Sequence, residues 1–147
     1  MKTLSTLFLC LLTLFSFSQD KIKYKTNGPF GRVSDTVPFA NATRIVVRTN
    51  LNQLDNYKRT KEVLAKMDIK LAGDRPVYGQ INTELILLKN ADSTIVRCMI
   101  LILCKETEIV MSCSDKSDKR SKKNGIIMFD KMKEIADQMG GKVYYTN

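Results

Sequence analysis

The feature that most restricts this fold is the run of residues 95–104, which is apolar at almost every position. Side chains of a β-strand alternate between two faces, so the run divides into two sets whatever its register. One set is Val96, Cys98, Ile100, Ile102 and Cys104, and the other is Ile95, Met99, Leu101 and Leu103, with Arg97 as the only charge. Both faces of this strand must therefore be covered.

Alternating apolar patterns on either side of this run predict further strands. We expect strands at residues 44–49, 69–72, 79–88, 94–104 and 108–114. The sequence Gly73-Asp74-Arg75-Pro76 is typical of a turn, and the breaks at 89–93 and 105–107 are short enough for hairpins. The last four predicted strands therefore form an antiparallel meander.

Two segments have the periodicity of amphipathic helices. In the first, Leu54, Tyr57, Leu64 and Met67 fall on one face, and Asn50 with Gln53 resembles a capping box. In the second, the apolar residues are Met128, Met132, Ile135 and Met139. Gly140-Gly141 is expected to end the second helix, and a short apolar tail at 142–145 could pair with a sheet edge.

These elements predict an α+β fold in which an antiparallel sheet of about five strands carries two helices packed on one face. The element order is β-α-β-β-β-β-α, followed by the short C-terminal apolar tail. We expect a single domain at residues 43–147, preceded by an extended N-terminal arm at 19–42 that holds two of the prolines and scattered apolar residues.

Residues 1–18 have the pattern of a cleavable secretory signal. Lys2 precedes an apolar and hydroxylic run, and Ser16-Phe17-Ser18 is a small-x-small cleavage site. The run is shorter than the roughly 20 apolar residues that span a bilayer, so no transmembrane anchor is expected after cleavage. We therefore expect an exported protein, periplasmic or secreted, that begins at Gln19.

The absence of histidine removes most common catalytic and metal sites. The usual Ser-His-Asp and Cys-His systems cannot form, and neither can most zinc sites. There is no glycine-rich phosphate loop, and the sequence predicts no cofactor and no metal. Glu84, Glu106 and Glu108 could support a carboxylate-based hydrolase, but no pattern places two of them around a cleft. We therefore expect no enzyme activity.

Charge indicates a second function class. The formal net charge is +9, and loss of Lys2 with the signal leaves +8. The densest basic cluster is the loop 115–124, with Lys116, Lys119, Arg120, Lys122 and Lys123. This loop could bind an envelope polyanion, or it could be a solvated connector. The export signal, the absence of tryptophan and the lack of aromatic residues among these charges argue against nucleic acid.

Three cysteines, Cys98, Cys104 and Cys113, remain once the signal is removed. All three lie in apolar stretches, so they could be buried thiols. Cys98 and Cys113 could instead form a disulfide across a hairpin, or one thiol could be reactive. The sequence leaves these alternatives open.

The second apolar face of the central strand is the candidate binding site. Its residues are Met99, Leu101 and Leu103, with Val110 as a neighbour on the next strand. If exposed, they would form a patch that soluble monomers avoid. Three groups could cover this face: the arm at 19–42, a second copy of the chain in a homodimer, or a ligand or protein partner. The sequence thus favours a non-enzymatic binding or interaction module.

A resemblance to a known group rests on three features. They are Ile45-Val46-Val47-Arg48-Thr49 before the first helix, Gly79-Gln80-Ile81-Asn82-Thr83 at the start of a strand, and the Gln19 start. With them the chain resembles the small exported proteins of uncharacterised function from Bacteroidota. The element order is also similar to that of the TATA-binding-protein-like fold. The resemblance implies no activity, and it does not imply DNA binding.

Overall fold

The computed structural model describes residues 34–36, 42–118 and 121–147. The predicted signal and most of the predicted arm lie outside these ranges. The elements are β1 Ser34–Asp35, β2 Arg44–Arg48, α1 Gln53–Lys66, β3 Leu71–Arg75, η1 Pro76–Tyr78, β4 Gln80–Thr83, β5 Ile86–Lys89, β6 Ile95–Lys105, β7 Glu108–Asp115, α2 Lys122–Met139 and β8 Lys142–Thr146.

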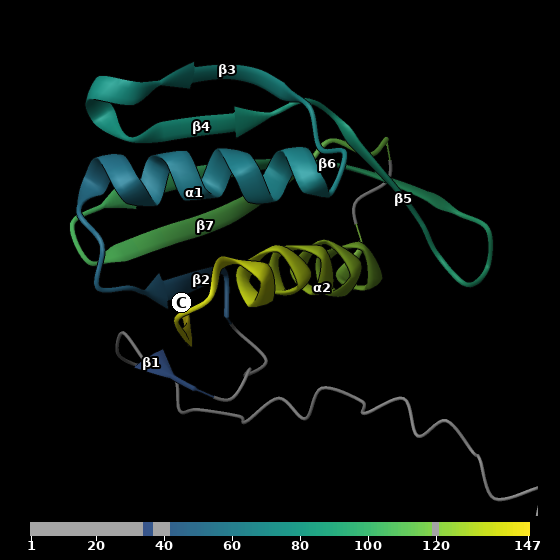
Figure 1. Cartoon of the computed structure of the whole chain (residues 1–147). Helices are drawn as coiled ribbons and strands as arrows, with labels where there is room; N and C mark the ends of the chain where they lie inside the picture. The colour runs from purple at the N-terminus through teal and green to yellow at the C-terminus, as the bar shows by residue number, and fades with distance from the viewer. Residues whose placement is uncertain (1–33, 37–41, 119–120) are drawn as a thin grey trace, which may run out of the picture.

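The strands form one sheet in the order β1-β8-β2-β7-β6-β4-β3, with β5 also paired to β6. Every pairing is antiparallel. Both helices lie on the same side of the sheet (Figure 1). The predicted α+β class and element order are confirmed, although the sheet has eight strands rather than about five. In the described part of the chain, no helix is long and apolar enough to cross a membrane.

The higher strand number comes partly from a break in the predicted strand at 79–88. Residues before the break form β4 and those after it form β5, and the two pair with different stretches of the long strand β6. The backbone N–H of Ile100 lies where neither strand reaches. It donates instead to the buried hydroxyl Oγ1 of Thr83, at 2.9 Å. A side chain thus completes the ladder where the partner strand changes.

The predicted turn at 73–76 forms later in the chain. Gly73, Asp74 and Arg75 belong to β3 and pair with β4. The chain reverses in the short helix η1 and at Gly79, which has a φ of 63°. Pairing with β4 satisfies the backbone groups of β3 that face β4, and this outweighs the local turn preference of its residues.

Helix α1 differs from its prediction at both its start and its buried face. The N-cap is Asn52, not Asn50, and its side chain accepts the backbone N–H of Asp55 at 2.9 Å. Tyr57 and Leu64 are buried as expected, but Leu54 is 54% exposed. Asn56 and Thr60 occupy the buried face in its place.

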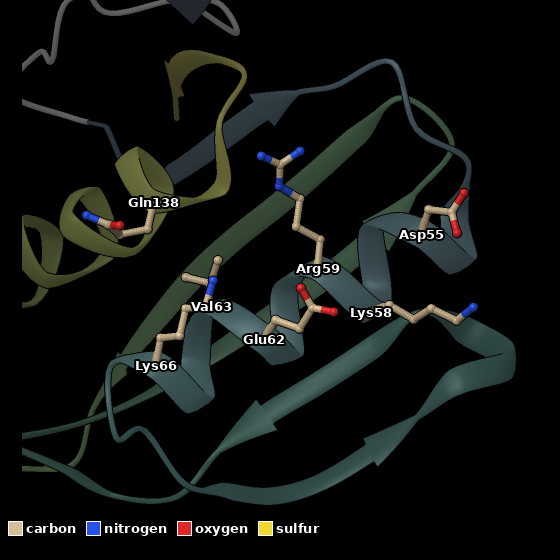
Figure 2. A pocket seen from close by; sticks show the side chains of 7 residues that line it. All are labelled: Asp55, Lys58, Arg59, Glu62, Val63, Lys66 and Gln138. Atoms are coloured by element: carbon tan, nitrogen blue, oxygen red, sulfur yellow. The ribbon is translucent and has the colours of Figure 1, made fainter.

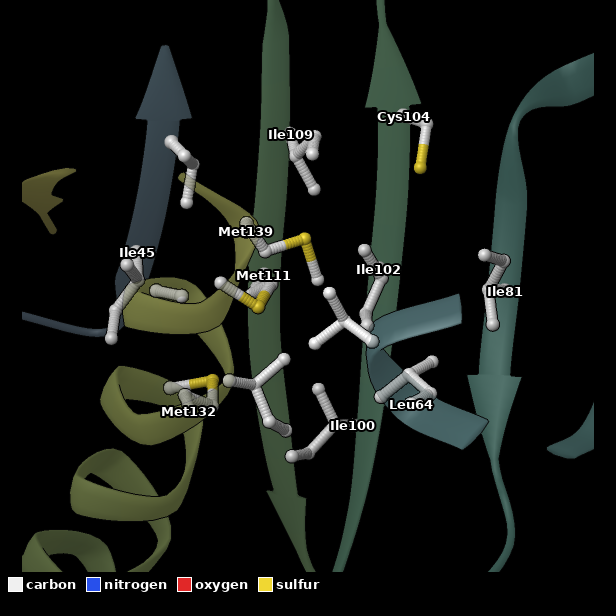
Figure 3. Close-up of a cluster of buried hydrophobic side chains, with 14 of the residues drawn as sticks. Ile45, Leu64, Ile81, Ile100, Ile102, Cys104, Ile109, Met111, Met132 and Met139 are labelled. Carbon is white, nitrogen blue, oxygen red and sulfur yellow. The ribbon is translucent and has the colours of Figure 1, made fainter. Parts of the chain in front are cut away.

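The core lies between the two helices and the helix-facing side of the sheet. The predicted α2 residues Met128, Met132, Ile135 and Met139 are all buried there. Met132, Ile135 and Met139 pack with Ile100 and Ile102 of β6 and with Ile45, Ile109 and Met111 from the neighbouring strands (Figure 3). Met128 packs with Val96 and Cys98 of β6 in a second, smaller cluster. Gly140 ends α2 as predicted, and the apolar tail forms β8, which pairs with β2. The helices therefore cover one face of β6. The opposite face, which no helix covers, is called here the outer face.

Candidate functional site

The centre of the outer face is an apolar row that crosses four adjacent strands. Its members are Tyr144 of β8, Val46 of β2, Val110 of β7 and Leu103 of β6, each paired in register with the next. Residues directly opposite each other in an antiparallel pair lie on the same face in contact distance. These four residues therefore form a continuous apolar strip, called here the apolar row.

The structure brings together all four residues predicted for the binding face. Met99, Leu101 and Leu103 alternate along β6, and Val110 lies opposite Leu103. Leu101 is 42% exposed, and the other three are half-buried. Sequence reasoning missed Val46 and Tyr144. Val46 could have been found from the sequence. Its position in β2 puts it on the same face as Arg44 and Arg48, opposite to the face of the buried Ile45 and Val47.

Basic residues surround the apolar row. Arg44 and Arg48 flank Val46 on the same face of β2, and Lys142 is the neighbour of Tyr144 on that face of β8. Glu108 is the only acidic residue at the outward positions of the described strands, and its carboxylate pairs with Lys105 at 2.9 Å. The outer face therefore combines an apolar centre with a positively charged rim.

A shallow hollow of about 240 Å³ lies on the outer face beside Met99 and Leu101. It is lined by Met99 and Leu101 together with the polar side chains of Asn82, Ser112, Ser114 and Lys116. Ser112 and Asn82 are the register partners of Leu101 on its two sides. The hollow offers apolar contact with hydrogen-bonding groups beside it.

A larger groove, of about 740 Å³, lies where β2 ends, α1 begins and α2 gives way to β8. We call it the end groove. Three basic side chains from three elements line it, namely Arg48, Arg59 and Lys142, with Tyr144 at its side. None of the three forms an ion pair with another described residue, whereas the groove's one carboxylate, Glu108, is paired with Lys105. The end groove is therefore positively charged.

Contacts hold these basic groups in place. The guanidinium carbon of Arg48 lies 4.8 Å from the ring centroid of Tyr144, and Nζ of Lys142 lies 5.4 Å from the same centroid. Arg59 packs against Gly140, where an added Cβ would be only 2.6 Å from Nη2 of Arg59. Arg59 thus lies at the negative end of the α2 dipole. The basic groups of the end groove are arranged before any ligand binds.

Another groove, of about 460 Å³, runs along the helix side of the molecule (Figure 2). Figure 2 shows charges of both signs projecting from α1, with Asp55 and Glu62 among Lys58, Arg59 and Lys66, and Gln138 of α2 across from them. Mixed charges compensate one another and offer little apolar contact. This groove has neither the apolar centre nor the mostly positive rim of the outer face.

The predicted anion-binding loop is brought together only in part. Lys116 lies just after β7, and its backbone N–H donates to the carbonyl of Arg97 at 2.7 Å. Lys122 and Lys123 are exposed in the first turn of α2, after the N-cap Ser121. Hydrogen bonds donated by Thr94 lower the pKa of Asp92, in the β5–β6 turn, and the charge of Lys123 lowers it further. Lys119 and Arg120 lie outside the described residues.

The three predicted acidic candidates are not gathered into one described site. Glu84 lies between β4 and β5, whereas Glu106 and Glu108 lie in and beside the β6–β7 turn. In the described ranges, no group of three or more cysteine or carboxylate side chains is arranged to hold a metal ion. Asp74 instead joins β3 to α1, accepting the hydroxyl of Tyr57 and pairing with Lys61 at 2.8 Å.

Cys98, Cys104 and Cys113 are free thiols in the structure. Cys98 lies opposite Asp115 and Cys113 lies opposite Ile100, so the two cysteines proposed for a disulfide are diagonal neighbours. Diagonal positions are roughly 7–8 Å apart, beyond the usual Cα separation for a disulfide. Burial, with smaller effects from Cys113 and Asp115, raises the pKa of Cys98 from 9.0 to about 11.

We expect Cys98 to resist alkylation in the folded protein. A pKa raised from 9.0 to about 11 lowers the thiolate fraction at pH 8 about a hundredfold, and the thiolate is the reactive form. Iodoacetamide at pH 8, followed by peptide mass mapping, should leave Cys98 unmodified in the native chain and modify it in urea. Equal labelling rates in both conditions would contradict the buried position of this thiol.

Comparison with known proteins gives a likeness at the level of structure. The sequence matches no protein-family profile and no curated protein. Ten solved chains are similar to it. Among them is a DUF4468 family protein from Bacteroides ovatus, with a TM-score of 0.41 and 12% sequence identity over 72% of this chain and 91% of that one.

Proposed function

We propose that this chain is an exported, non-enzymatic binding module that docks a partner on the outer face of its sheet. The partner presents apolar groups together with negative charge. The observation that carries the proposal is the apolar row, which is left uncovered by both helices and is surrounded by basic side chains. The signal pattern at 1–18 supports export.

Two alternative covers fit the outer face less well. The described part of the arm, β1, pairs with β8 at the edge of the sheet and so extends the sheet instead of lying over it. A two-fold dimer would place the same patch against itself, so its basic rim would meet another basic rim. A partner with negative charge is attracted by that rim instead.

The proposal predicts that the outer face binds an uncharged apolar probe. N-phenyl-1-naphthylamine, which fluoresces in apolar surroundings, should bind the folded chain. Replacing Val46 and Val110 by threonine keeps their shape and strand preference but adds two hydroxyls to the apolar row. We expect probe affinity to fall about tenfold or more in the double variant Val46→Thr/Val110→Thr.

Val77→Thr is the matched control, because Val77 is 84% exposed in η1, away from the outer face. Its probe binding should equal that of the natural sequence. Circular dichroism should show that all variants are folded. A folded chain that does not bind the probe, or binding that is unchanged in Val46→Thr/Val110→Thr, would remove the basis of the proposal.

A further inference from the structure

The end groove and the apolar row are parts of one continuous surface. Tyr144 belongs to both: it lines the end groove and is the first member of the apolar row. Arg48 and Lys142 lie next to it on the same face, as register partners of each other. The positive charge of the end groove therefore begins where the apolar row begins.

The dimensions of the apolar row favour a thin, extended occupant. Neighbouring strands lie roughly 4.8 Å apart, so the row from Tyr144 to Leu103 is about 14 Å long. Beyond Leu103 the next register partner is the polar Gln80 of β4. The row is also bounded along its length, because Arg44 and Arg48 flank Val46 in β2. A single alkyl chain lying across the strands fits this strip.

The chemistry of the end groove favours an anionic head. Arg48 and Arg59 each carry a planar fork of donors that suits carboxylate or phosphate oxygens. Lys142 adds a third charge. The one carboxylate that lines the groove, Glu108, is the register partner of Arg48 but forms its ion pair with Lys105, at 2.9 Å. The contacts of Arg48 and Lys142 with Tyr144 and of Arg59 with Gly140 reduce the ordering that binding would require.

We infer that the ligand of the outer face is a single-chain anionic amphiphile. Its carboxylate or phosphate head lies in the end groove between Arg48, Arg59 and Lys142, and its alkyl chain lies along the apolar row. This inference rests on the proposed function, since it needs the outer face to be a docking surface. It adds the class of ligand and the direction in which the ligand lies.

Calorimetric titration of the folded chain with four probes tests the inference. Dodecyl phosphate and dodecanoate supply both head and tail, dodecyl maltoside supplies the tail with an uncharged head, and inorganic phosphate supplies the head alone. The amphiphiles are used below their critical micelle concentrations. We expect dodecyl phosphate and dodecanoate to bind at least about tenfold more tightly than the other two probes.

Charge variants locate the head. Arg48→Gln/Arg59→Gln should weaken dodecyl phosphate binding by about tenfold or more and leave dodecyl maltoside binding within about twofold. The matched control is Lys58→Gln/Lys66→Gln, which removes the same charge from the other groove of α1 (Figure 2). It should change dodecyl phosphate binding by less than about twofold, because Lys58 and Lys66 do not line the end groove and exposed charges are screened by salt. Equal losses in the two double variants would show general charge attraction and overturn the inference.

The probes also separate failure of the inference from failure of the proposed function. If dodecyl maltoside and the anionic amphiphiles bind equally well to the apolar row, the anionic head is wrong and the docking face stands. If inorganic phosphate binds as tightly as dodecyl phosphate, and Val46→Thr/Val110→Thr changes neither, the end groove takes a free anion and the inference fails. If no amphiphile binds the folded chain, the inference fails, and binding of N-phenyl-1-naphthylamine then decides whether the docking face stands.

Discussion

Ile102→Ala is expected to lower the free energy of unfolding by about 2–5 kcal/mol. Ile102 lies at the centre of β6, is fully buried, and packs in the cluster shown in Figure 3. Alanine would leave a cavity between the sheet and both helices, and neighbouring side chains of a close-packed core fill such a space only in part. Urea denaturation followed by circular dichroism measures the change.

Leu101→Ala is the matched control, one residue earlier on the opposite face of the same strand. Leu101 is 42% exposed, so its truncation should cost less than about 1 kcal/mol. The pair also bears on function. If Leu101→Ala costs as much as Ile102→Ala, the outer face is already buried in the folded chain, and the proposed docking surface loses its basis.

Gly79→Ala is expected to destabilise the fold by at least about 2 kcal/mol. Gly79 has a φ of 63°, a conformation that costs a residue with a Cβ roughly 1–2 kcal/mol. An added Cβ would also overlap the backbone carbonyl oxygen of Cys104, which cannot rotate away. To relieve this overlap, β4 would have to move from β6, and the hydrogen bond from the N–H of Cys104 to the carbonyl of Gly79, 2.8 Å long, would be lost.

Gly73→Ala provides the comparison for this substitution. Gly73 has no positive φ, and an added Cβ there would have no heavy atom within 4 Å. Alanine also restricts the unfolded chain, so Gly73→Ala should be neutral or slightly stabilising. Both variants can be measured by thermal and urea unfolding. Equal stability of the two would show that the backbone around Gly79 adapts and that the close approach to Cys104 is not required.

Burial of polar residues is one feature that local patterns did not predict. Asn56 is fully buried on α1, where it donates to the carbonyls of Lys105 at 2.8 Å and Leu51 at 3.2 Å. Its side-chain oxygen Oδ1 accepts the hydroxyl of Thr49 at 2.8 Å. Asn56 thereby joins α1 to the β6–β7 turn and to the loop after β2. An apolar periodicity cannot identify such a residue, because its partners are polar groups that lie outside α1.

The candidate site was also predicted only in part. The alternation of β6 was enough to place Met99, Leu101 and Leu103 on one face, whatever the register. The end groove required more, since Arg48, Arg59 and Lys142 come from β2, α1 and β8. The pairing of β8 with β2 places Lys142 beside Arg48, and the end of α2 against Arg59 closes the groove.

The sequence by itself determined the elements whose apolar residues repeat with a regular period. The two-residue period of β6 fixed which side chains share a face, and the spacing of Met128, Met132, Ile135 and Met139 fixed the buried side of α2. Tertiary structure alone decided which strands lie side by side and where the basic groups converge. It also decided that Leu54 is exposed and Asn56 is buried. The physical reason is that a period describes neighbours along one element, whereas strand pairing and helix packing choose neighbours that are far apart in the chain.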